Sequence, residues 1–170
     1  MTLANAETLP FTMKPMDMNQ TSEIRFVQDM QTAQANGDLS QWIGDKELYL
    51  LRNAANKNKG LGFALAGNFY PDFLLWLVDR ETGEQWLSLI DPKGILHMGI
   101  DDPKFGLAEE IKNLQKENGL AIQLNAFILS ITERENLTHQ YDETVYQAKN
   151  ILFMQDKDYL KTMFEKMLAD

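Results

Sequence analysis

Two acidic residues stand out because apolar side chains surround them. Asp72 follows Pro71 in the stretch NFYPDFLLWL, residues 68–77, and Asp91 closes the stretch WLSLID, residues 86–91. Lys93 comes two positions after Asp91. A carboxylate within an apolar segment is costly to remove from water unless it has a partner, so both acids are candidates for one shared charged site.

A β-hairpin would bring these acids together. The polar stretch RETGE, residues 80–84, separates the two apolar runs and predicts a hairpin with a two-residue loop at Thr82–Gly83. This pairing places Lys93 opposite Asp72, with Asp91 diagonal to Asp72 on the same face of the sheet. A slip of one residue would send the two acids to opposite faces.

A third acid comes from a predicted helix. Glu23, Phe26, Val27 and Met30 recur at helical spacing, so Glu23 shares the face that packs on the protein. Mg²⁺ prefers carboxylate oxygens and water, and a nearby lysine can hold a phosphate or help ionise a water molecule. Three acids and Lys93 therefore suit hydrolysis of a phosphodiester, which needs an activated nucleophile and positive charge at phosphorus.

Each of these residues also has an ordinary structural explanation. Pro71-Asp72 and the stretch DPKG, residues 91–94, are both typical of turns. An acid such as Glu23 in a first helical turn complements the helix dipole. The loop NAANKNKGLGF, residues 53–63, supplies further candidates, which either touch a substrate phosphate or are simply solvated: Arg52, which precedes the loop, Lys57 and Lys59.

Composition indicates one folded domain. The chain of 170 residues has 44% hydrophobic and 24% charged residues, which is typical of a globular protein. It has no apolar segment of the roughly 20 residues that would span a membrane, and no signal peptide is expected. The absence of cysteine suits a reducing cytoplasm. The net charge of −9 argues against nucleic-acid binding over the whole surface.

The hydrophobic pattern predicts an α/β fold in which helices flank a central mixed β-sheet. Residues 1–18 are expected to be a lead-in or linker, and residues 19–170 the folded domain. The predicted order is helix, three strands, helix, two strands, helix, in the sequence α-β-β-β-α-β-β-α.

The two acids and the lysine resemble the PD-(D/E)XK nuclease motif, in which Pro71-Asp72 is followed by Asp91-Pro92-Lys93. Many members of that superfamily carry a helical glutamate where this chain has Glu23. More narrowly, GNFYPDFLLWL and LSLIDPKG are similar to the carboxy-terminal endonuclease domain of type III restriction enzymes and related helicase-fused nucleases. The resemblance spans roughly residues 20 to 168.

The resemblance implies a restriction-endonuclease-like core and Mg²⁺-dependent cleavage of double-stranded DNA, with Mn²⁺ as a substitute. Asp72 and Asp91 would ligate the metal with help from Glu23, and Lys93 would orient the attacking water or the phosphate. It further implies a bacterial or archaeal cytoplasmic restriction-modification system, with an ATP-dependent helicase or translocase region and a methyltransferase subunit.

The chain has no GxxxxGK[ST] segment, so it is expected to be a domain separated from its motor, with ATP acting only through that motor. Two other hypotheses remain open. The domain could be a non-catalytic, restriction-endonuclease-like module for DNA docking or assembly, which the acidic charge favours. It could also be a plain α/β interaction domain whose acids cap turns.

Overall fold

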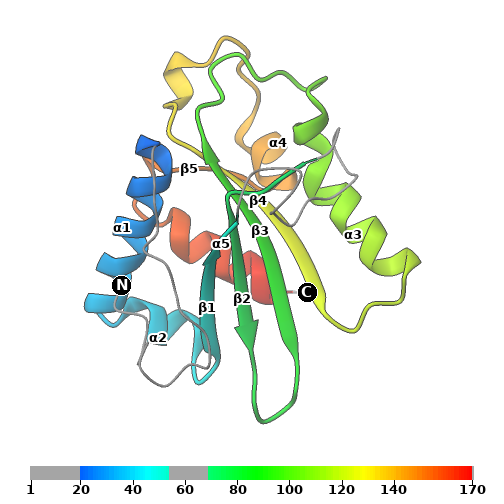
Figure 1. Cartoon of the computed structure of the whole chain (residues 1–170). Coiled ribbons are helices and arrows are strands. Elements are labelled where there is room, and N and C mark those ends of the chain that lie inside the picture. The colour runs from blue at the N-terminus through cyan, green and yellow to red at the C-terminus, as the bar shows by residue number, and fades with distance from the viewer. Residues whose placement is uncertain (1–19, 54–68, 170) are drawn as a thin grey trace.

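The computed structural model describes residues 20–53 and 69–169, and its centre is a five-stranded mixed sheet (Figure 1). The strands lie in the order β1-β2-β3-β4-β5. β1, β2 and β3 pair with one another in antiparallel fashion, whereas β3, β4 and β5 run parallel to one another. Their bounds are β1 Glu47–Arg52, β2 Phe73–Val78, β3 Gln85–Lys93, β4 Gln123–Ser130 and β5 Ile151–Phe153.

Helices flank this sheet, which confirms the predicted α/β class. Three of them lie where the hydrophobic pattern placed a helix: α1 Thr21–Ala35, α3 Leu107–Glu117 and α5 Tyr159–Leu168. The predicted order omitted α2, Asp38–Ile43, and α4, Glu143–Ala148, as well as the short 3-10 helices η2, Pro103–Gly106, and η3, Arg134–Asn136. Elements of six residues or fewer are too short to show a helical repeat, so the sequence pattern could not reveal them.

The hairpin between β2 and β3 differs from its predicted register. Pairing runs from Phe73 opposite Ile90 to Val78 opposite Gln85, so residues 79–84 form a longer loop than the two residues predicted. The backbone N–H of Asp79 donates to the carbonyl of Glu84 at 2.9 Å, which closes this loop. The register is shifted by two residues, and because side chains alternate with a period of two, every side chain keeps its predicted face.

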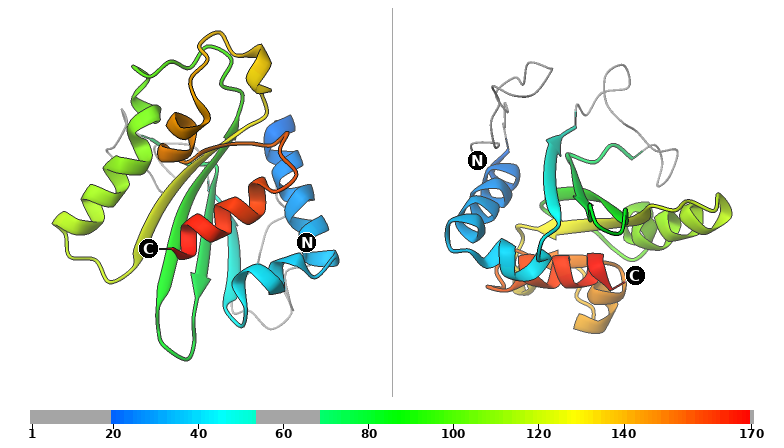
Figure 2. Two further views of the ribbon diagram at one scale, coloured as in Figure 1. Left: turned by 180° about the vertical axis from the view of Figure 1, so that it is seen from behind. Right: turned by 90° about the horizontal axis from the view of Figure 1, so that it is seen from below.

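Three apolar clusters hold the helices against the sheet. In the largest, α1, α2 and α5 pack on side chains such as Phe73 and Leu75 of β2. A second cluster joins α3, through Leu107 and Ile111, to β3 and β4, and a third joins α4 to the end of the sheet where β4 meets β5. Figures 1 and 2 show α1 and α2 at one side of the molecule and α3 at the other.

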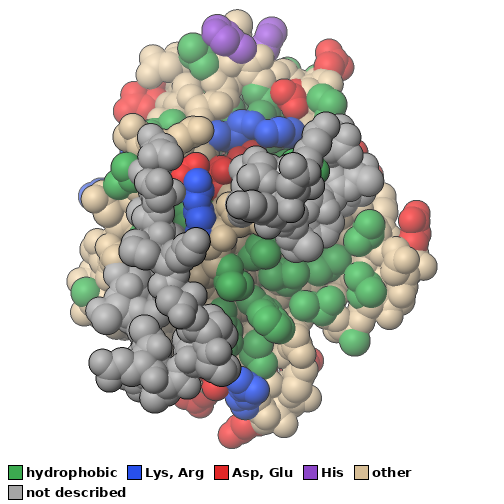
Figure 3. All heavy atoms as spheres, viewed as in Figure 1, with side chains coloured by type: hydrophobic (Ala, Val, Ile, Leu, Met, Phe, Trp, Pro, Cys, Tyr) green, Lys and Arg blue, Asp and Glu red, His purple; other side chains and the backbone are tan. Residues whose placement is uncertain are grey.

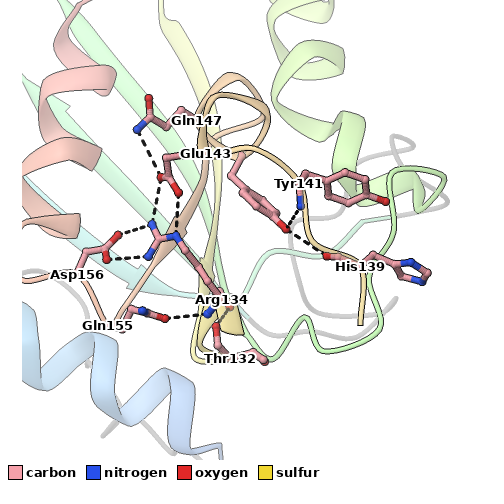
Figure 4. Close-up of polar contacts among 10 residues, drawn as sticks. Thr132, Arg134, His139, Tyr141, Glu143, Gln147, Gln155 and Asp156 are labelled. Carbon is pink, nitrogen blue, oxygen red and sulfur yellow. Dashed lines mark hydrogen bonds and ion pairs between the residues drawn. The ribbon is translucent and has the colours of Figure 1, made fainter. Parts of the chain in front are cut away.

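A network around Arg134 fixes the connection between β4 and β5 (Figure 4). The guanidinium donates to both carboxylate oxygens of Asp156, at 2.8 and 2.6 Å, and to Glu143 at 2.8 and 3.1 Å. It also lies 4.0 Å from the ring centroid of Phe153. Because one planar cation is held by two acids and a ring, the long connection is tied to the carboxyl end of the sheet.

No helix within residues 20–53 and 69–169 has the length and apolar character needed to cross a membrane.

Candidate active site

The candidate site lies where β2 begins and β3 ends. Asp72 immediately precedes β2, and Asp91 lies within β3. Asn53, at the end of β1, fixes the start of β2, since its backbone N–H donates to the Asp72 carbonyl at 2.8 Å and its amide donates to the Pro71 carbonyl at 2.9 Å. These two hydrogen bonds hold the main chain at Pro71 and Asp72, and so fix the point from which the Asp72 side chain extends.

The structure brings the two acids together more directly than the sequence predicted. Continuing the β2–β3 register by one step places Asp72 opposite Asp91, and not opposite Lys93. Burial, and after it the charge and hydrogen bonding of Asp91, together raise the pKa of Asp72 to about 7. Glu23 adds to this effect and Arg52 opposes it. The negative charges of Asp91 and Glu23 therefore disfavour ionisation of Asp72.

Two lysines contact one oxygen of Asp91. The Nζ atoms of Lys93 and Lys104 each lie 3.4 Å from Oδ2 of Asp91, which is itself buried. Lys104 belongs to η2, whose start Asp102 caps by accepting the Lys104 backbone N–H at 2.9 Å. The Lys104 ammonium also lies 5.4 Å from the ring centroid of Phe69.

The two ammonium groups differ in how firmly they hold their protons. Burial lowers the pKa of Lys93, against the opposing charge of Asp91, and the neighbouring Lys104 lowers it further. Burial also acts to lower the pKa of Lys104, but hydrogen bonding with Lys93 and the charges of Asp91 and Asp102 outweigh it, so this pKa is raised. Lys104 therefore holds its proton more firmly, whereas Lys93 loses its proton more readily.

The first turn of α1 closes the site from the other side. Glu23 is buried, as its helical face predicted, and its Oε2 lies 2.7 Å from Nη1 of Arg52. These two buried atoms form an ion pair whose angle falls outside hydrogen-bond geometry. The neighbouring Ser22 hydroxyl donates to the Pro92 carbonyl at 2.8 Å, which joins α1 to the end of β3.

Arg52 has protein partners of its own, since it pairs with Glu23 and lies 5.4 Å from the Phe73 ring centroid. Its predicted contact with a substrate phosphate stays a prediction. The other two candidates from the same loop, Lys57 and Lys59, lie outside the described residues. Sequence reasoning missed Lys104, because it lies in a 3-10 segment whose side-chain directions follow no helical or strand repeat.

The donor set suits a hard divalent cation. Asp72 and Asp91 offer carboxylate oxygens from adjacent strands, and the raised pKa of Asp72 reports repulsion that a cation would relieve. In the described part of the chain, no three His, Cys, Asp or Glu side chains form a metal-binding cluster. Two protein carboxylates with water completing the coordination is an arrangement that Mg²⁺ commonly accepts.

A hollow of about 410 Å³ begins at Lys93 and is lined by residues 93–98 and Asp102. Asp72 and Asp91 are not among its described lining residues. Figure 3 shows acidic and basic side chains meeting on the same face of the molecule, above a broad apolar area.

Comparison of the chain with protein-family models, with curated proteins and with solved structures finds no match.

Proposed function

We propose that this protein is a metal-dependent DNA endonuclease domain with a restriction-endonuclease-like core, which hydrolyses phosphodiester bonds as the cleavage module of a type III-like restriction enzyme. The observation that carries the proposal is the meeting of Asp72 and Asp91 at one end of the sheet, with Lys93 within 3.4 Å of Asp91. Two acids that can hold a cation, with a lysine beside them, suit phosphodiester hydrolysis.

In this proposal Asp72 and Asp91 hold Mg²⁺, or Mn²⁺ in its place, and Glu23 assists through its charge. When bound, the cation supplies Lewis-acid activation of water and neutralises charge on the phosphate. Lys93 orients the attacking water or takes its proton, because burial lowers the pKa of this lysine. Lys104 keeps its proton and stabilises negative charge developing on the phosphate.

The resemblance extends the proposal to partners. Double-stranded DNA would be the substrate, delivered by an ATP-dependent helicase or translocase region and a methyltransferase subunit, in the cytoplasm of a bacterium or archaeon. The net charge of −9 is consistent with DNA affinity that depends on those other parts.

A second candidate function is a non-catalytic module for DNA docking or assembly. One observation favours it: two ammonium groups already neutralise Asp91 without any metal. In that case the acids and lysines would form a structural ion-pair cluster. The domain would then hold DNA or other subunits in place and would catalyse no reaction.

Calorimetric titration with Mn²⁺ distinguishes the two functions. The nuclease proposal expects the wild-type chain to bind the ion and Asp91→Asn to lose that binding. Asp45→Asn removes the same charge from an exposed residue and should bind as the wild type does. Circular dichroism on each variant reports whether it is folded. Absence of binding in the folded wild type would contradict the nuclease proposal and favour docking.

A further inference from the structure

A second concave site lies at the free edge of β4, away from the paired acids. β4 pairs with β5 only from Ile128 onward, so residues 123–127 have no strand neighbour on that side. A pocket of about 660 Å³ is found there, between α3, the end of α4 and the end of α5. Figure 2 shows these three helices around β4. Pockets of this volume commonly hold small molecules.

Lysines dominate the charge of this pocket. Four of them line it, and they come from three different elements: Lys112 and Lys116 of α3, Lys149 after α4, and Lys166 of α5. The whole chain has 16 lysines and arginines against 25 acids, so a quarter of its cationic side chains gather at one place. Such a concentration on an acidic protein would create a local positive potential.

Two of the lysines have contacts of different kinds. Lys149 pairs with Glu109 at 3.2 Å, and Glu109 is the one acid among the described residues that line the pocket. Lys166 donates to the Gln147 carbonyl at 2.9 Å, a neutral acceptor that does not cancel its charge. The described residues that line the pocket thus comprise four lysines and one glutamate, an excess of cations that would attract a multiply charged anion.

A buried amide at the base of the pocket supplies the second, independent observation. Asn125 is 2% exposed and lines the pocket, and its Nδ2 has no hydrogen-bond partner among the described residues. Leaving a buried donor without a partner destabilises the folded protein. Ser88, directly across from Asn125 on β3, also has a buried hydroxyl with no hydrogen-bond partner in the described part of the chain. A ligand that accepts a hydrogen bond from Asn125 would explain why a polar side chain is buried at this position.

We infer that this pocket binds a small anion bearing two or more phosphate groups, with Asn125 donating to one oxygen and the lysines neutralising the charge. Lysine binds phosphate as a point charge, and all the cations among the described residues that line this pocket are lysines. The inference does not depend on the proposed nuclease function, because the pocket shares no residue with the candidate active site.

Calorimetric titration of the whole chain with inorganic pyrophosphate, in EDTA and at constant ionic strength, tests the inference. Lys166→Gln should weaken binding about tenfold, as expected for loss of a charge-assisted contact. Lys161→Gln is the matched control, since this exposed lysine lies on the same helix and outside the pocket, and it should change the affinity less than twofold.

Asn125→Leu separates binding from folding. Because Nδ2 has no hydrogen-bond partner among residues 20–53 and 69–169, an apolar side chain of similar size should leave urea stability unchanged or slightly higher while binding is lost. Equal weakening by Lys161→Gln, or no pyrophosphate binding at millimolar concentration, would overturn the inference. A short DNA duplex that displaces pyrophosphate would also overturn it, because the pocket would then belong to a nucleic-acid surface.

Discussion

Replacing Asp72 by asparagine should make the metal-free protein more stable at alkaline pH than the wild type. Burial and the charge of Asp91 raise the pKa of Asp72 to about 7, above its usual value of 3.8. Between about pH 4 and pH 7 the unfolded chain has therefore lost this proton while the folded protein still holds it. Wild-type stability falls as pH rises through that window and levels off above it.

The size of the effect follows from this linkage. From pH 5 to pH 7 the cost accumulates over two pH units at about 1.36 kcal/mol each, which sets an upper bound of about 2.7 kcal/mol. Asp72 is partly exposed, so solvent screening reduces the expected value to about 1–1.5 kcal/mol. Asparagine carries no charge and escapes this cost. The stability advantage of Asp72→Asn over the wild type should therefore grow by about that amount between pH 5 and pH 8.

Urea denaturation in EDTA at the two pH values measures this difference. Asp79→Asn is the matched control, because hydrogen bonds from the backbone N–H groups of Thr82 and Glu81 lower the pKa of Asp79. Asp79 is ionised in both the folded and the unfolded chain across this range, so its variant should lose the same stability at both pH values. If the difference in unfolding free energy between Asp72→Asn and the wild type stays constant or shrinks as pH rises, the reasoning is refuted.

Four further substitutions test individual ion pairs and hydrogen bonds. Glu23→Gln leaves the Arg52 guanidinium without its buried partner and should lower the free energy of unfolding by about 2–3 kcal/mol, measured by urea denaturation; an unchanged midpoint would contradict the pairing. Ser22→Ala should cost about 1–2 kcal/mol in the same assay, and Ser22→Thr should restore part of it, because the lost hydroxyl is the donor to the end of β3. Arg134→Lys should lower thermal stability by about 1 kcal/mol, since lysine cannot make the two parallel hydrogen bonds to Asp156. Equal stability of the lysine variant would mean that this paired contact contributes nothing.

The sequence predicted that Asp72 and Asp91 lie on one face of the sheet, but it did not predict which residues of β2 and β3 pair. The apolar runs fixed where β2 and β3 lie, and because a strand alternates with a period of two, Asp72 and Asp91 stayed on one face although the register moved by two residues. The loop length, which sets the register, depends on how Asp79 closes the turn, and a propensity for turns does not determine that.

Contacts between distant segments could not be predicted from local pattern. Lys104 contacts Asp91 from a 3-10 helix, and Arg52 of β1 contacts Glu23 of α1. Neither contact follows from a helical or strand repeat in the sequence. The inward direction of Glu23 was predictable, because its neighbours at helical spacing are apolar. The short helices α2 and α4 lack enough turns for the same argument.

Cleavage of a fluorescent DNA duplex in the presence of Mn²⁺, at protein in excess over DNA, tests the proposed nuclease function most directly. The account expects cleavage by the wild type and by Asp45→Asn, and its loss in Asp91→Asn and in Lys93→Met when both variants are folded. Cleavage that persists in Asp91→Asn would contradict the account, as would a wild-type chain that binds Mn²⁺ at this site and leaves the duplex intact.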